Sequence, residues 1–106
     1  MDKIDRTKRT KKFYEAILQL KDMEQCCDFF EDLCTMKEIQ VMEQRFEVAG
    51  MLKKDKVYTE IADKTNASSA TISRVKRMLD YGTGCLSDMI DQIQEKEEGN
   101  ARESEE

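Results

Sequence analysis

The stretch Ile61 to Leu79 reads IADKTNASSATISRVKRML and decides the fold that the sequence predicts. Ala62 is small enough to let two helices cross closely, and Asn66 is one of the few residues that tolerate the left-handed backbone of a sharp turn. After the turn, apolar residues recur at the i, i+3 and i+7 spacing of one helix face. These residues are Ile72, Val75 and Leu79. Together, these properties predict a helix-turn-helix over about residues 58–79.

The opposite face of the second predicted helix carries the candidate functional residues. Ser68 or Ser69 can cap its first turn, where free backbone amides and the helix dipole favour a phosphate. Short side chains allow close approach to base edges in the major groove, while long basic side chains reach backbone phosphates. The candidate DNA-binding residues are Thr59, Ser68, Ser69, Ala70, Thr71, Ser73, Arg74, Lys76 and Arg77. The alternative interpretation is a solvated, capped surface helix with a few basic side chains.

Helices are also predicted on the N-terminal side of this motif. Asp22 is the predicted N-cap of one of them. Thr35-Met36-Lys37-Glu38 forms a capping box, in which the Thr35 hydroxyl and the Glu38 carboxylate each accept from the other residue's backbone amide. The helix that this box opens runs to about residue 54 and is apolar on two sides. In so short a chain, the second apolar side is expected to pack against another protomer, which predicts a homodimer.

Composition places the chain in the all-α class. The 106 residues include no proline and four glycines, so long stretches lack helix breakers. We expect a basic flexible arm over residues 1–12 and a single helical domain over residues 13–94. Residues 95–106 are acidic and carry no apolar side chain bulkier than alanine, which predicts a disordered tail.

The distribution of charge matters more than the net charge of −5, which by itself argues against nucleic acid. Residues 1–12 hold six basic and two acidic side chains, and residues 53–77 hold seven basic and three acidic ones. Acidic side chains dominate residues 13–52 and 88–106. Because local charge decides where a phosphate backbone docks, the basic block around the predicted motif favours double-stranded DNA as the partner.

Several function classes are disfavoured by what the sequence lacks. It contains no histidine and no C-x-x-C pair, so we predict no metal site and no cofactor. The glycines are isolated, so a phosphate-binding glycine loop is absent, and we predict that the protein is not an enzyme. No apolar run is long enough for a membrane span or a signal peptide, so we expect no membrane association and a cytoplasmic location.

The segments LCTMKEIQVMEQRFEVAGML and NASSATISRVKRML, which lie between Leu33 and Leu79, resemble the Trp repressor. The span from about Phe13 to Tyr81 is closer still to the uncharacterised Trp-repressor-related YerC/YecD group, through FFEDLCT, EIQ and ATISRVKR. The resemblance implies a Trp-repressor-like, intertwined homodimer with paired helix-turn-helix heads. It also implies a sequence-specific transcription regulator, a repressor, that binds the major groove.

The resemblance further implies where an effector would bind. In the Trp repressor, tryptophan sits between the central helix and the recognition helix, held by two arginines and a threonine. The matching residues of a possible effector pocket are Thr35, Arg45 and Arg74. A glycine and a serine of that pocket are matched here by the bulkier Val75 and Met78, so we expect no tryptophan corepressor. Arg45 can instead pair with Glu43 or Glu47, contact a phosphate, or remain solvated.

A protein–protein interaction module or adaptor is the alternative function, in which the helical dimer and the acidic tail dock another protein. Salt separates the two hypotheses, because DNA binding weakens steeply through counterion release as the salt concentration rises. A mainly apolar protein contact does not weaken in this way.

Overall fold

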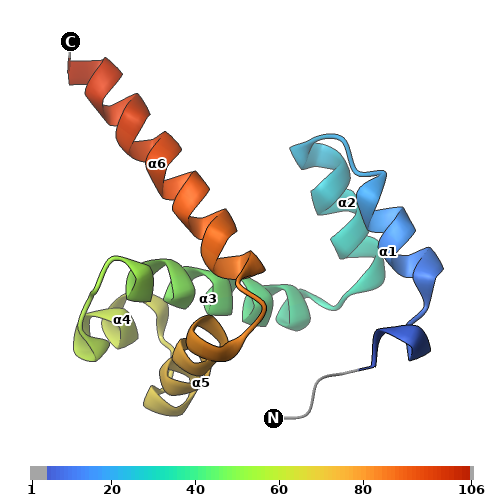
Figure 1. Ribbon diagram of the computed structural model, residues 1–106, viewed down its shortest axis with the longest axis horizontal. Coiled ribbons are helices and arrows are strands. Elements are labelled where there is room, and N and C mark those ends of the chain that lie inside the picture. Colours follow the sequence, from blue (N-terminus) through green and yellow to red (C-terminus); the bar gives the residue numbers. More distant parts are fainter. Residues whose placement is uncertain (1–4, 106) are drawn as a thin grey trace. The chain divides into compact units, whose positions relative to one another are not determined.

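The structure, a computed structural model, describes residues 5–105 and contains helices and no strand within that range. A short 3-10 helix, η1 (Arg6–Lys8), precedes the α-helices (Figure 1). The α-helices are α1 (Lys11–Leu18), α2 (Met23–Leu33), α3 (Met36–Lys53), α4 (Tyr58–Thr65), α5 (Ser69–Tyr81) and α6 (Cys85–Glu105). The predicted all-α class is confirmed. The chain divides into two compact units, residues 1–39 and 40–106, and the division falls within α3. The single helical domain expected over residues 13–94 stays a prediction.

Part of the expected basic arm is helical. Residues 1–4 lie outside the described residues, but Asp5 caps η1 by accepting a 2.9 Å hydrogen bond from the backbone amide of Thr7. The Thr7 hydroxyl donates a second bond of 2.7 Å to the same carboxylate. Both bonds favour the ionised carboxylate and therefore lower the pKa of Asp5. The bond from the Thr7 hydroxyl has the larger effect, and the bond from the Thr7 amide has the smaller one.

Two further helix starts in the N-terminal unit follow the sequence predictions. Asp22 accepts a 2.8 Å bond from the backbone amide of Gln25 at the start of α2. At the start of α3, the Thr35 amide donates to the Glu38 carboxylate at 2.8 Å, and the Glu38 amide donates to the Thr35 hydroxyl at 3.1 Å. The predicted capping box is therefore confirmed.

The hydrophobic core lies in the C-terminal unit, among α3, α4, α5 and α6. Its buried residues are Val48, Ala49, Ile61, Ala67, Ile72, Val75 and Ile90. Ile72 and Val75 face this core as the helical spacing predicts, and Leu79 packs against it while half-buried. This packing fixes one face of α5 and leaves the opposite face free.

The last helix, α6, is longer than predicted. It continues to Glu105, where the sequence predicts a disordered tail from residue 95. Its C-terminal half extends away from α3 in Figure 1. Residues 95–105 are rich in Glu, Lys, Ala and Arg, whose helix propensities are high, and they include no proline. The polarity of this segment predicts its exposure, but polarity alone does not make a backbone irregular.

Candidate nucleic-acid interface

The turn between α4 and α5 has the geometry that the sequence predicts. Asn66 adopts the left-handed conformation, with φ 59° and ψ 16°. Its backbone amide donates a 2.9 Å bond to the Ala62 carbonyl and closes the end of α4. Ala67 follows, buried beneath the turn with 6% of its surface exposed. A left-handed residue and a small one therefore redirect the chain into α5.

Two polar residues that support this turn were not predicted from the sequence. The Thr65 hydroxyl donates a 2.8 Å bond to the Ile61 carbonyl and accepts a 3.2 Å bond from the Ala67 amide. Gln44 Nε2, on α3, donates a 3.0 Å bond to the Thr65 carbonyl. Gln44 and Thr65 are 21 positions apart, so no local sequence pattern reveals their contact.

Ser68, and not Ser69, caps α5. Its hydroxyl oxygen accepts a 3.1 Å bond from the Thr71 amide, and its hydroxyl donates to Thr71 Oγ1, also at 3.1 Å. The sequence leaves both serines open as caps, and the structure selects the first. Ser69 is exposed at the first position of the helix.

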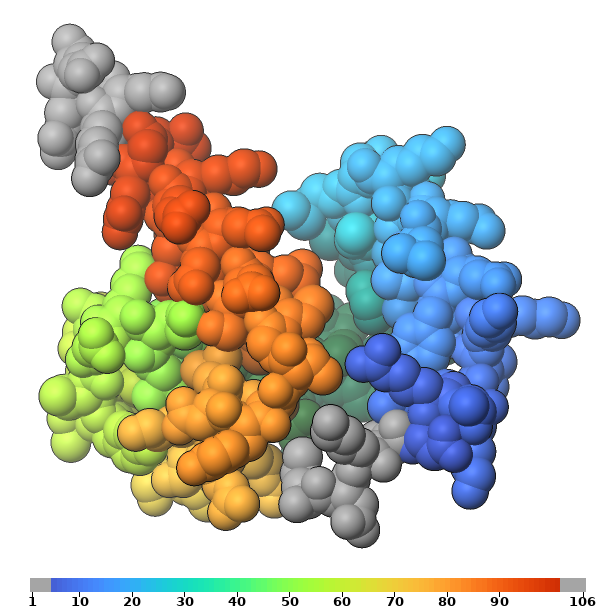
Figure 2. Space-filling model, in the orientation of Figure 1, coloured from blue at the N-terminus to red at the C-terminus, as the bar shows by residue number. Residues whose placement is uncertain are grey.

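The candidate DNA-binding residues are all exposed except Thr71, which is half-buried. Side chains of α5, gold to orange in Figure 2, reach the surface on the face shown. At about 100° per residue, four of the candidates lie opposite the buried Ile72 and Val75. These four are Ala70, Ser73, Arg74 and Arg77. Ser69 and Lys76 lie on one flank of this face, and Thr71 lies on the other.

Basic side chains lie near the start of α4. Lys56 and Lys76 line an open hollow together with Tyr58, the first residue of α4. Val57, the N-cap residue, makes no side-chain hydrogen bond to the helix, as its residue type predicts. Thr59 is exposed in the first turn. Asp55 and Asp80 also line this hollow and partly balance its lysines, while the uncapped amides at the start of α4 favour an anion.

The residues of the possible effector pocket lie at the start of α3, within α3 and on α5. Thr35 caps α3 in the N-terminal unit, while Arg45 on α3 and Arg74 on α5 are exposed in the C-terminal unit. Val75, at the position that the resemblance matches to a glycine, is 1% exposed and belongs to the core. Met78 is 38% exposed. The effector pocket stays a prediction.

Comparisons with known proteins identify the family. The family model described as Trp repressor protein matches residues 8–95. This chain belongs to the Trp repressor family. The uncharacterised protein YerC of Bacillus subtilis (strain 168) is 47% identical over 97 residues, which are 92% of each chain.

Solved structures agree with membership of the Trp repressor family. A TrpR-like protein from Eubacterium eligens ATCC 27750 matches with a TM-score of 0.77 and 48% identity, over 79% of this chain and 87% of that one. A structure from Staphylococcus aureus gives a TM-score of 0.75 and 43% identity, over 78% and 83%. The resemblance inferred from the sequence and the Trp-repressor-like fold are confirmed. Within the described residues, no helix combines the length and apolarity that crossing a membrane requires.

Proposed function

We propose that this protein is a sequence-specific DNA-binding transcription regulator, a repressor and not an enzyme, that acts as a homodimer in the cytoplasm. In this proposal α4 and α5 form a helix-turn-helix, and α5 enters the major groove of double-stranded DNA. The observation that carries the proposal is the exposed face of α5, where short side chains and two arginines lie opposite the core. Trp repressor proteins bind DNA, typically as dimers, which supports it.

Along the exposed side of α5, short side chains come first and long basic side chains follow. Ala70 and Ser73 are short, so the helix can approach base edges closely, and the Ala70 methyl suits contact with a thymine methyl. Arg74 lies one turn after Ala70 and is long enough for a guanine edge or a phosphate. Lys76 and Arg77 follow and suit backbone phosphates. The face is therefore suited to base reading at its start and to phosphate contacts farther along.

The capped start of α5 and the start of α4 add phosphate contacts. The backbone amides of Ser69 and Ala70 lie in the first turn of α5, where the helix dipole favours an anion. Ser68 and Thr71 hold this turn together through their two 3.1 Å hydrogen bonds, so they act first as support for the reading face. Thr59 is exposed in the first turn of α4, where the helix dipole favours an anion, and it suits a flanking phosphate.

Exposed apolar side chains support the homodimer. No residue between 5 and 39 is buried, and Leu18 and Met23 are 83% and 79% exposed. On α3, Met42 and Phe46 lie one turn apart and are 43% and 42% exposed. An apolar surface of this extent is usually covered by a partner, and a second copy is the partner that the family favours.

We propose further that tryptophan is not a corepressor of this protein. Val75, at the position that the resemblance matches to a glycine of the tryptophan pocket, is buried in the core and carries bulk that a glycine lacks. Titration calorimetry is expected to give no measurable heat of tryptophan binding, and DNA affinity is expected to stay the same when tryptophan is added. Micromolar affinity for tryptophan would show that the steric reasoning is wrong.

Binding titrations across a salt series test the DNA-binding proposal. A duplex selected from random sequence is compared with a scrambled one, for the wild type, Ser73→Ala and Lys76→Ala. Lys96→Ala, on an exposed lysine of α6, removes the same charge away from α5 and serves as the control. We expect Lys76→Ala to weaken binding to both duplexes and to lower the slope of log affinity against log salt by about one unit.

The base-reading variant has a different expected signature. Ser73→Ala should change the preferred sequence, at a cost of about 1–3 kcal/mol in discrimination if a base contact is lost, with the salt slope unchanged. Lys96→Ala should change neither quantity. If Lys76→Ala alters the sequence preference while Ser73→Ala does not, the wrong side of α5 has been assigned to the bases.

A protein–protein interaction module is the second candidate function. The observation that favours it is the polar part of α6, which is helical and exposes Glu95, Glu97 and Glu98. A preformed acidic helix suits a basic partner surface. Absence of salt-dependent binding to any duplex would favour this candidate over the regulator.

A further inference from the structure

A hydrogen bond connects α3 to the turn that directs α5. Gln44 Nε2 donates to the carbonyl oxygen of Thr65, the last residue of α4, at 3.0 Å. The last carbonyls of a helix have no partner within that helix, and Gln44 supplies one from α3. Gln44 is half-buried and Thr65 is 9% exposed, so water competes weakly for this bond.

The Thr65 carbonyl lies close to the start of α5. A small rotation of α5 about this point would displace the far end of the helix by a larger distance. Asn66 follows immediately in its left-handed conformation, and α5 begins three residues later. The 13 residues of α5 span about 20 Å at 1.5 Å per residue. A rotation of about 10° at one end would therefore displace the other end by about 3 Å, close to one base-pair step.

We propose that Gln44 is a positioning residue that sets the direction of α5 relative to α3, and thereby the half-site spacing that the dimer recognises. The inference rests on the proposed function. At about 100° per residue, Met42 and Phe46, the exposed apolar residues of α3 that we assign to the dimer surface, lie on the opposite side of α3 from Gln44. The helix α3 would therefore join two protomers through one side, and through Gln44 on its other side it would hold the turn that orients each recognition helix.

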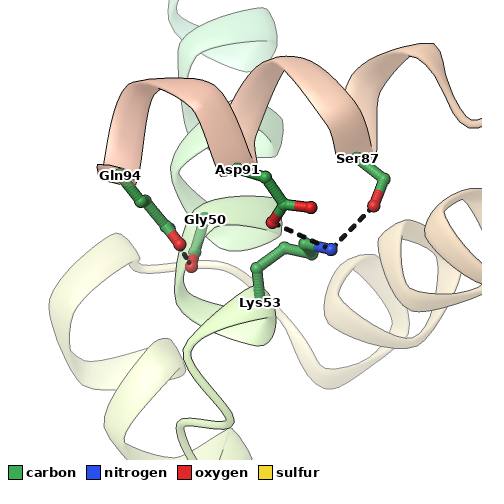
Figure 3. A network of polar contacts seen from close by, with 5 residues as sticks. All are labelled: Gly50, Lys53, Ser87, Asp91 and Gln94. Atoms are coloured by element: carbon green, nitrogen blue, oxygen red, sulfur yellow. Dashed lines mark hydrogen bonds and ion pairs between the residues drawn. The ribbon is translucent and has the colours of Figure 1, made fainter. Parts of the chain in front are cut away.

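The chain offers a matched control in a second hydrogen bond from a glutamine amide to a backbone carbonyl, which runs from α6 to α3. Gln94 Nε2 on α6 donates to the Gly50 carbonyl at 2.9 Å, and Gln94 is also half-buried (Figure 3). Close by, Lys53 Nζ bonds to Ser87 Oγ at 2.7 Å and to Asp91 Oδ1 at 3.1 Å. These contacts hold α6 and do not involve the α4–α5 turn. A variant that loses the Gln94 bond therefore shows how the loss of one such bond affects stability when the α4–α5 turn is unchanged.

The experiment compares Gln44→Met with Gln94→Met. Methionine has nearly the same length and helix propensity as glutamine but has no N–H donor. Each variant is titrated against the selected duplex and against duplexes whose half-site spacing is one base pair shorter or longer. Thermal unfolding is followed by circular dichroism, so that binding is measured on folded protein.

We expect Gln44→Met to weaken binding at the selected spacing by about tenfold, the size of one net hydrogen bond, and to reduce the preference between spacings. The salt slope should not change, because no phosphate contact is removed. Both variants should lower the melting temperature by a similar amount, because each loses one hydrogen bond. Gln94→Met, however, should keep the spacing preference of the wild type. Gln44→Lys, which restores an N–H donor of similar reach, should restore the preference.

Two results would overturn the positioning role of Gln44 without affecting the proposed DNA-binding function. One is a Gln44→Met protein whose spacing preference stays within twofold of the wild type while the wild type binds DNA specifically. The other is an equal loss of spacing preference in Gln94→Met, which would trace the effect to general loosening. If the wild type itself prefers no sequence at any salt concentration, the proposed function fails, and the positioning role fails with it.

Discussion

The hydroxyl of Thr65 donates a 2.8 Å hydrogen bond to the carbonyl of Ile61, one helical turn earlier. It also accepts a 3.2 Å bond from the amide of Ala67, beyond the turn. Thr65→Val keeps the shape of the side chain but removes both bonds and leaves the amide of a buried residue without this partner. We expect a loss of about 1–3 kcal/mol in the free energy of unfolding, measured by chemical denaturation. Thr65→Ser keeps the hydroxyl and should lose less, so equal losses in the two variants would contradict this explanation.

The end of α3 contains a second left-handed residue, Asp55, with φ 57°. Its amide donates to the Leu52 carbonyl at 3.0 Å, and the Lys56 amide donates to the Met51 carbonyl at 3.1 Å, which together form a Schellman motif. Asp55→Gly removes the Cβ that this conformation strains and should stabilise the protein by up to about 1 kcal/mol. Asp55→Ala keeps the strain and serves as the control. Equal melting temperatures for the glycine and alanine variants would refute the prediction.

The capping box gives the stability an acid dependence. The Thr35 amide, and then the Thr35 side chain, lower the pKa of Glu38 below its usual value of 4.5 by favouring the ionised carboxylate. The stabilisation is therefore present above the unfolded-state pKa and is lost as the pH falls through the lowered folded-state pKa. Glu38→Gln should remove this part of the acid dependence. The measurement is chemical unfolding at several pH values between about 6 and 3, and superimposable pH profiles for wild type and variant would count against it.

The exposed apolar side of α3 predicts the state of association. Sedimentation equilibrium at micromolar concentration should give a mass about twice the 12.4 kDa of the chain. Phe46→Glu places a charge in the proposed interface and should shift the equilibrium toward the monomer. Glu43→Gln, at an exposed position on the same helix, is the control and should leave the dimer intact. A wild-type protein that sediments as a monomer would remove the basis for the dimer.

Local interactions were predictable from the sequence because their chemistry is contained in a few consecutive residues. The capping box of Thr35 and Glu38 and the left-handed turn at Asn66 both lie within four residues of chain, and both have the predicted geometry. The helix spacing of Ile72 and Val75 likewise identified the buried face of α5, and so also the face that remains exposed.

Contacts between distant segments were not predictable in the same way. The Gln44–Thr65 and Gln94–Gly50 bonds depend on how the helices pack, and a glutamine on a helix gives no sign of which carbonyl it will meet. The length of α6 was missed for a different reason. The prediction relied on the absence of apolar residues after residue 94, whereas helix propensity continues to residue 105 without a buried face.

The continuous course of α6 has a practical consequence for spectroscopy. Ala101 lies seven positions after Gln94, which is bonded to α3, and at 1.5 Å per residue this places Ala101 about 10 Å farther along the helix axis. A fluorophore attached at Ala101 would be fixed to a helix and not to a flexible tail. Its slow anisotropy decay would report the tumbling of the C-terminal unit, and the increase in rotational correlation time on adding a DNA duplex would give a direct measure of complex formation.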